Sequence, residues 1–314
     1  MATKSPRSSA LRMTLSFLSL AALAILNLSS CTIKKAELGT AENPVKLFFV
    51  PSVDAKVIDA NSKIMKEWLE AHTPYKFEIH IPQSYIAVVE AFGSKRADVA
   101  ALNPFGYYLA NKKYGAEARL IVERYGSAYY RSQIIAKKGL FKDISDLNGK
   151  KFAFVDPASM SGYILPLKFL RDSGVKLGET VFAMKHDNVV SMIYQGQVDA
   201  GATFYSPKDE KDGIQDARRL VKAQYPDVED KVEILKLTVE IPNDPITFRK
   251  ELSEEMKAKI SEAFVEMVKT DEGREVFKNI YGVTGVKIAS DKDFDMVRTM
   301  VSEAKIDVEG SLKK

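Results

Sequence analysis

The alternation of short apolar segments with amphipathic segments constrains the fold of this chain more than any other feature of its sequence. Residues 45–52 form a continuous apolar run, which is typical of a strand buried on both faces. Residues 54–71 follow with apolar side chains at helical spacing, which indicates an amphipathic helix. The same pattern predicts further strands at residues 75–81, 98–102, 119–124, 133–136, 152–155, 180–184, 200–204 and 232–237. It predicts further helices at residues 86–92, 162–173, 188–195 and 251–269.

Strands that alternate with helices in this way are expected in an α/β fold, with mainly parallel sheets covered by helices on both faces. The chain has 314 residues, of which 46% are apolar, so it can form the packed cores of two medium-sized domains. We therefore expect two doubly wound α/β lobes with a ligand cleft between them.

The first 31 residues resemble the leader of a bacterial lipoprotein. Residues 1–12 are polar and basic, and residues 13–28 are apolar but form a run too short for a comfortable membrane span. The leader ends in Leu-Ser-Ser-Cys, and Cys31 is the expected site of lipid attachment. A lone cysteine is more commonly a small buried side chain, but its place after this run favours lipidation. We predict a signal peptide at residues 1–30, a tether over residues 31–43, and an extracytoplasmic, membrane-anchored protein.

The charge balance argues against a nucleic-acid partner. The formal net charge is +4, and Lys4, Arg7 and Arg12 of the leader account for three of these charges. The rest of the chain therefore lacks the basic excess of a nucleic-acid-binding protein. The single cysteine excludes an internal disulfide framework and a Cys-cluster metal site. We expect neither a cofactor nor a metal.

The segment Asp-Pro-Ala-Ser-Met-Ser-Gly at residues 156–162 lies between an expected strand and an expected helix. Ser159 or Ser161 can cap that helix, and Gly162 would let a ligand approach the backbone closely. The free N–H groups and the positive end of the helix dipole would suit a tetrahedral oxyanion. Taken alone, an ordinary serine-capped helix is the simpler interpretation.

From about residue 44 to 300 the chain resembles the periplasmic phosphonate- and phosphite-binding proteins of ABC importers. The loop after the expected strand is similar to the Asp-Pro-x-Ser-Thr-Ser-Gly loop of this family, whose hydroxyls and amides hold the phosphonate oxygens. The resemblance implies ligand-binding roles for Ser159, Ser161 and the backbone N–H of Met160. Met160 replaces the usual threonine, so one hydroxyl donor is missing.

The resemblance also implies the type II periplasmic-binding-protein fold, in which two crossover segments join the lobes. We expect lobe 1 at residues 44–134 and 241–314 and lobe 2 at residues 135–240. The crossover segments are expected near residues 131–137 and 236–243.

Three more residues are assigned to the site by the resemblance. His186 matches a histidine that contacts the phosphonate, Asp244 belongs to a similar Ile-Pro-x-Asp-Pro segment, and Tyr85 matches a ligand-facing tyrosine. Each has a simpler alternative: a helix cap for His186, a turn for Asp244 and a core position for Tyr85. A bound dianion would keep His186 charged at neutral pH. The carboxylate of Asp244 would repel an anion, unless the anion keeps a proton or the aspartate orients a donor.

The matches at Asn103, Tyr130 and Arg131 are less specific. Arg131 could clamp an oxyanion with two N–H groups, but a strand exposes half of its side chains, which slightly favours a surface position.

One departure from the family pattern bears on the ligand. Residues 202–207 read Ala-Thr-Phe-Tyr-Ser-Pro, where the aminophosphonate-binding members carry an acid that pairs with the ligand ammonium. Without that carboxylate a buried ammonium would be costly, so an aminoalkylphosphonate is a poor candidate. Phosphite, phosphate, methylphosphonate, or a less related ligand shaped by Tyr205 and Ser206, fits better.

These features predict a lipid-anchored solute-binding protein, expected to be a monomer, that captures a small phosphorus oxyanion by lobe closure and delivers it to an ABC permease. No catalytic residue is assigned, because the sequence shows no metal-ligand cluster, nucleotide loop or Ser/His/Asp constellation. Three alternatives stay open: a sensor lipoprotein for a membrane receptor, an enzyme that acts on a phosphonate, and a surface lipoprotein with a non-phosphorus ligand.

Overall fold

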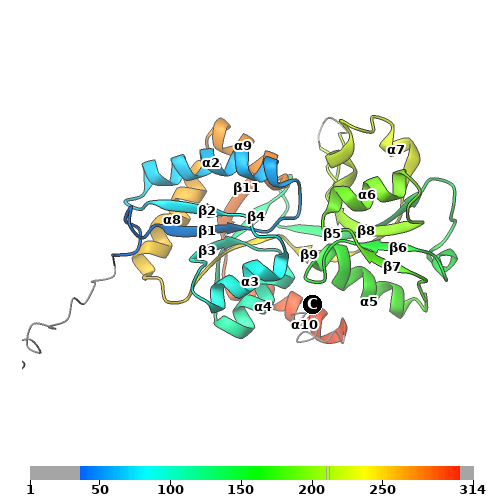
Figure 1. Ribbon diagram of the computed structural model, residues 1–314, viewed down its shortest axis with the longest axis horizontal. Helices are drawn as coiled ribbons and strands as arrows, with labels where there is room; N and C mark the ends of the chain where they lie inside the picture. Colours follow the sequence, from blue (N-terminus) through cyan, green and yellow to red (C-terminus); the bar gives the residue numbers. More distant parts are fainter. Residues whose placement is uncertain (1–35, 210, 212, 305–314) are drawn as a thin grey trace, which may run out of the picture. The chain divides into compact units, whose positions relative to one another are not determined.

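A computed structural model describes residues 36–209, 211 and 213–304 (Figure 1). The predicted signal peptide and Cys31 lie outside the described residues. No helix within the described ranges is long and apolar enough to cross a membrane.

The first sheet has six strands in the order β11-β4-β10-β3-β1-β2. Their bounds are β1 Val45–Phe49, β2 Phe77–His80, β3 Val99–Ala101, β4 Glu117–Glu123, β10 Pro245–Phe248 and β11 Gly285–Ile288. The helices that cover it are α2 Ala55–His72, α3 Tyr85–Gly93, α4 Pro104–Tyr114, α8 Glu254–Met267 and α9 Asp271–Tyr281. Helices α2 and α9 lie on one face of this sheet, and α3 and α4 lie on the other (Figure 1).

The alternation of side chains along β1 explains this two-sided packing. Leu47 and Phe49 join the core beneath α2, α8 and α9, whereas Phe48 joins the core beneath α3 and α4. Since successive side chains of a strand point to opposite faces, a run that is apolar at every position must be covered on both sides.

The second sheet has five strands in the order β7-β6-β8-β5-β9. Their bounds are β5 Tyr129–Lys137, β6 Phe152–Phe154, β7 Thr180–Phe182, β8 Ala200–Tyr205 and β9 Val232–Pro242. Its longer helices are α5 Leu165–Asp172 and α6 His186–Tyr194, which pack on opposite faces. Shorter helical segments are η1 Ile144–Leu147, the π-helical turn η2 Met160–Ile164, η3 Ala217–Val221 and α7 Val228–Lys231.

The expectation of mainly parallel sheets is wrong, because both sheets are mixed. β1 is parallel to β2 and β3, and β6 is parallel to β7 and β8. β10 is antiparallel to both of its neighbours, as is β5. Only strands joined by a helical crossover within one sheet are required to run parallel, and β5 and β10 enter their sheets from the other lobe.

β10 and β11 were not among the strands predicted from the sequence pattern. β10 has four residues and begins with Pro245, which weakens its strand signal. β10 nevertheless lies between β3 and β4 in the middle of the first sheet, and all four of its residues are buried.

The chain passes between the two sheets at residues 124–128 and again at residues 243–244. β5 and β9 pair from Tyr129–Pro242 to Lys137–Val232, so both lie wholly in the second sheet. The first passage therefore precedes the expected segment at residues 131–137, and the second follows the end of β9.

The end of the predicted tether also differs from expectation. The Lys76 N–H donates to the carbonyl of Gly39, and Leu38 packs against the core beneath α2, α8 and α9. Residues 38–43 thus belong to the packed unit that extends from Leu38 onward.

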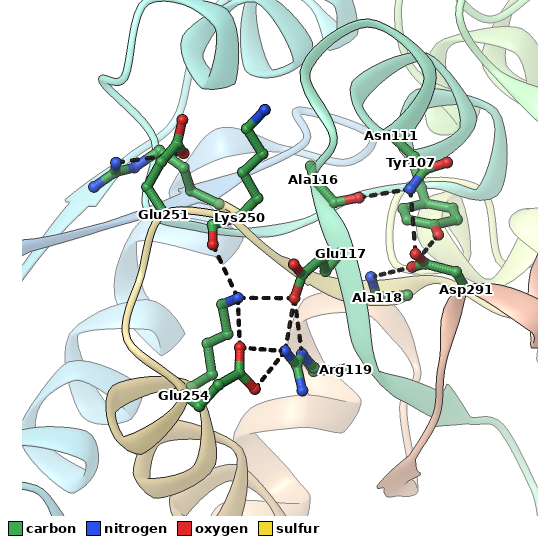
Figure 2. A network of polar contacts seen from close by, with 12 residues as sticks. Tyr107, Asn111, Ala116, Glu117, Ala118, Arg119, Lys250, Glu251, Glu254 and Asp291 are labelled. Atoms are coloured by element: carbon green, nitrogen blue, oxygen red, sulfur yellow. Dashed lines mark hydrogen bonds and ion pairs between the residues drawn. The ribbon is translucent and has the colours of Figure 1, made fainter.

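A polar network holds the C-terminal segment against the first sheet (Figure 2). This segment comprises η4 Asp291–Phe294 and α10 Asp295–Ala304. The Asp291 carboxylate accepts hydrogen bonds from the Tyr107 hydroxyl at 2.5 Å and the Ala118 N–H at 2.9 Å. Close by, the buried ammonium of Lys257 donates to Glu117 at 2.8 Å and to Glu254 at 2.9 Å. α10 also reaches the second lobe, where Arg171 donates to the Ala304 carbonyl at 2.6 Å.

Candidate functional site

A pocket is lined by residues from both lobes. The volume open to the centres of water molecules is about 50 Å³, so the pocket suits a small ligand. Its polar lining from the first lobe and the passages consists of Ser52, Tyr85, Asn103, Arg124, Asp244 and Tyr281. The second lobe contributes Tyr130, Ser159, Ser161, His186 and Arg219.

The loop at residues 156–162 has the geometry of a helix start that presents free donors. The Ser159 hydroxyl accepts a hydrogen bond from the Gly162 N–H at 3.0 Å and so caps the turn. Within the described residues, the N–H groups of Met160 and Ser161 donate to no hydrogen-bond acceptor. Both serines line the pocket, so these amides lie at its wall, where an anion would find donors and the positive helix end.

Gly162 is also required for the packing of the loop itself. A Cβ atom at this position would lie 2.4 Å from Cγ2 of Val155 and 2.9 Å from Oγ of Ser159. Any side chain would therefore push the loop away from the end of β6 and disturb the cap.

His186 begins α6, and only 5% of it is exposed. Its ring packs edge-on against Phe204, with centroids 4.9 Å apart, and its Nδ1 atom has no partner within the described residues. Burial, and to a lesser degree the nearby Arg124 charge, lowers the pKa of His186 to about 3. The imidazole is therefore neutral at pH 7 in the ligand-free protein, and it would be charged only if a bound anion raised this pKa.

The pKa of His186 predicts a pH dependence of stability. Between about pH 6.5 and about pH 3 the unfolded chain binds a proton at this residue and the folded chain does not. Stability should therefore fall as the pH falls below 6.5, by about 1.4 kcal/mol for each pH unit from this group. Urea unfolding of the ligand-free protein and His186→Gln at pH 7, 6 and 5 isolates the contribution, because the other titrating groups are shared. Parallel pH profiles for the two proteins would contradict the prediction.

Arg124 is one of two cations of the site that the sequence prediction missed. Its guanidinium donates to the Asp244 carboxylate at 2.6 Å, to Oδ1 of Asn243 at 2.5 Å and to the Tyr281 carbonyl at 3.0 Å. Only 8% of Arg124 is exposed. Asp244 thus orients the guanidinium of Arg124, a hydrogen-bond donor. This is one of the two conditions under which we expected an aspartate beside a bound anion.

Tyr85 and Tyr130 are buried at the pocket wall. Burial is the largest cause that raises the pKa of each phenol, with a further contribution from the Asp244 charge. Both hydroxyls therefore keep their protons and can donate to an anion. The core position considered for Tyr85 and its ligand-facing role are compatible, because its ring is buried while its hydroxyl lies at the pocket.

Four buried polar atoms of this pocket have no hydrogen-bond partner within the described part of the chain: Tyr85 OH, Asn103 Nδ2, His186 Nδ1 and Arg219 Nε. A buried polar group without a partner costs about 1–3 kcal/mol, so such groups are rare in folded proteins. All four belong to residues that line this one small pocket, which indicates a polar ligand there. Arg219, like Arg124, was not predicted from the sequence.

Three predicted residues do not place their side chains in the pocket. The Met160 side chain is buried in the core, and only its N–H was assigned to binding. Arg131 and Tyr205 do not line the pocket, and Arg131 pairs with Glu240 on the surface at 3.2 Å. Successive side chains of a strand point to opposite faces. Because Tyr130 and Phe204 face the pocket, the adjacent Arg131 and Tyr205 face away from it. Within the described residues, no group of His, Cys, Asp and Glu could hold a metal ion.

Comparisons with known proteins agree with this geometry. Residues 47–294 match the family described as the periplasmic substrate-binding protein of phosphonate ABC transporters. The chain is 30% identical over 204 residues to the phosphate-import protein PhnD of Mycolicibacterium smegmatis, and the match covers 59% of this chain and 63% of that protein. It is 24% identical over 177 residues to a probable phosphite-binding protein of Prochlorococcus marinus, covering 50% and 57%. The chain thus matches less than two thirds of the length of these curated relatives.

Solved structures share the fold. The binding component of a phosphonate transporter from Pseudomonas aeruginosa has a TM-score of 0.72 and 16% identity, covering 86% of this chain and 92% of that one. PhnD1 from Prochlorococcus marinus in complex with methylphosphonate has a TM-score of 0.71 and 17% identity, covering 82% and 97%. These likenesses confirm the predicted two-lobed, type II periplasmic-binding-protein fold. With the match over residues 47–294, they lead to the conclusion that this chain belongs to the family of periplasmic substrate-binding proteins of phosphonate ABC transporters.

Proposed function

We propose that this protein is an extracytoplasmic solute-binding protein that captures a small phosphorus oxyanion between its lobes and delivers it to an ABC permease. The observation that carries the proposal is the convergence of buried, unpartnered polar atoms on one pocket beside two free loop amides. An oxyanion of tetrahedral phosphorus would accept hydrogen bonds from several of these groups at once.

The charges of the pocket support an anionic ligand. Arg124 and Arg219 bring two positive charges and Asp244 brings one negative charge, while His186 is neutral without a ligand. The lining therefore has a net charge of about +1 before binding, to which the helix end at Ser159 adds a partial positive charge.

Because both lobes provide hydrogen-bond donors to the ligand, ligand binding is coupled to closure of the lobes. Tyr85 comes from α3 of the first lobe, whereas Ser161 and His186 come from the second. A ligand touches both sets only when the lobes are together, so it stabilises the closed arrangement by its differential affinity. A permease would then distinguish the loaded from the empty protein by shape.

The relatives support this ligand class: one is a phosphate-import protein, one is a probable phosphite-binding protein, and one solved structure holds methylphosphonate. We propose that the present chain binds a ligand of the same size and charge, without turnover. We also propose a lipid anchor at Cys31, on the leader sequence alone, and a monomeric state.

Thermal unfolding with phosphite, phosphate, methylphosphonate and sulfate tests the proposed function, followed by calorimetry on the compounds that stabilise the protein. A ligand that binds only the folded state adds about 4 kcal/mol of stability at a thousand times its Kd. We expect at least one phosphorus oxyanion to stabilise the protein more than sulfate does. Stabilisation by none of the three would contradict the proposal.

A further inference from the structure

Arg219 is a cation at the pocket wall without a partner in the described part of the chain. It belongs to η3, next to Arg218 in the sequence. Arg218 is fully engaged: it donates to the Asp216 carboxylate at 2.8 and 3.0 Å and to the Val232 carbonyl at 3.0 Å. The side chain of Arg219 makes neither an ion pair nor a hydrogen bond with any described residue, and its Nε atom is buried. The guanidinium of Arg218 is therefore bound by other groups of the protein, whereas the guanidinium of Arg219 can bind a ligand.

The surroundings of Arg219 hold it close to the first lobe. A Cβ atom built on Gly282 would lie only 2.9 Å from its Nη2 atom, so the guanidinium packs against the backbone at the end of α9. Arg219 lines the same pocket as Arg124, His186 and the serine loop.

The charge of Arg219 has no compensation within the pocket. Asp244 is the only carboxylate among the described lining residues, and Arg124 already occupies it at 2.6 Å. Burial lowers the pKa of Arg219, and the nearby Asp216 charge offsets only part of this effect. Such a desolvated charge is costly unless an anion pairs with it.

We propose that Arg219 is a specificity-determining residue that binds an anionic oxygen of the ligand and excludes ligands with an ammonium group at this end of the site. This inference rests on the proposed function. The oxygen can belong to the same phosphorus group that the serine loop holds or to a second acidic group on the ligand. In both cases the ligand brings negative charge to Arg219.

The test compares the wild-type protein with Arg219→Gln by calorimetry, using phosphite, methylphosphonate, phosphonoacetate and 2-aminoethylphosphonate. Lys222→Gln is the matched control, because it removes the same charge at the end of η3 from an exposed side chain that pairs with Glu229. Loss of a charge-assisted hydrogen bond weakens binding roughly 10- to 100-fold. We expect Arg219→Gln to lose that factor for phosphite and to lower the preference for phosphite over 2-aminoethylphosphonate at least tenfold, whereas Lys222→Gln changes neither.

Phosphonoacetate distinguishes the two sources of the anionic oxygen. Tighter wild-type binding of phosphonoacetate than of methylphosphonate, lost in Arg219→Gln, assigns Arg219 to a second acidic group. Equal or weaker binding of phosphonoacetate, with phosphite still sensitive to the substitution, assigns Arg219 to the phosphorus group itself. Both results support the proposal.

A stability measurement separates the ligand role from a structural one. Because Arg219 is an uncompensated cation, ligand-free Arg219→Gln should unfold at a temperature no lower than that of the wild type. Unchanged selectivity in a folded Arg219→Gln variant that still binds phosphite would overturn the inference and leave the proposed function standing. Wild-type protein that binds none of the four compounds would overturn both.

Discussion

Replacement of Ser161 and His186 by alanine together is expected to abolish high-affinity binding of phosphorus oxyanions and to leave the fold intact. Both residues line the pocket, and His186 Nδ1 has no protein partner within the described residues. A hydrogen bond to a charged ligand is worth about 1.5–3 kcal/mol, so the loss of two weakens binding roughly 10²- to 10⁴-fold. Calorimetry with the oxyanion that the wild type binds most tightly measures this loss.

The control for this variant is Ser94→Ala combined with His72→Ala, which removes the same side chains from exposed positions of the first lobe. Its affinity should equal that of the wild type. Thermal unfolding without ligand shows whether the pocket variant is folded. A folded pocket variant with affinity within threefold of the wild type would refute the assignment of the serine loop and His186 to the ligand.

Arg124→Met is expected to have the largest effect on stability. Arg124 and Asp244 form a largely buried ion pair, with side-chain exposures of 9% and 20%. Removal of one partner leaves the other charge buried and unpaired, which costs about 3–5 kcal/mol. The substitution also removes the hydrogen bonds to Asn243 and the Tyr281 carbonyl, so it loosens the passage between the lobes. Urea unfolding measures the change in free energy.

The double variant Arg124→Met with Asp244→Leu separates the pair from the ligand site. Without an unpaired carboxylate it should regain most of the lost stability, because an apolar pair of similar volume can replace a buried ion pair. Binding of the oxyanion should stay at least tenfold weaker, since the oriented guanidinium is gone. If the single variant unfolds like the wild type, the pair does not stabilise the fold, and the role given to Asp244 is wrong.

The sequence predicted the site best where local chemistry defines it. The Ser159–Gly162 turn is a serine-capped helix start in the structure, and its capping contact spans three residues, so its pattern is visible in the sequence alone. His186 at the start of α6, and Tyr85 at the start of α3, which Ser84 caps, were assigned to the site by the family resemblance. These residues meet in one pocket.

The sequence left open those positions that depend on which face of a strand is directed inward. Arg131 was a candidate because an arginine suits an oxyanion, yet it lies on the outer side of β5 and pairs with Glu240. A shift of one residue along a strand reverses the face of its side chain, and composition does not reveal that register.

What the sequence by itself determined is the alternation of strands with helices and the loop with free amides, because each depends on residues a few positions apart. What only the tertiary structure decided is which of the 46 lysines and arginines become part of the site. Arg124 meets a carboxylate 120 residues away, and Arg219 meets none within the described chain. Burial and the pairing of charges are properties of contacts between distant segments, and the fold creates those contacts only when the two lobes and their passages are assembled.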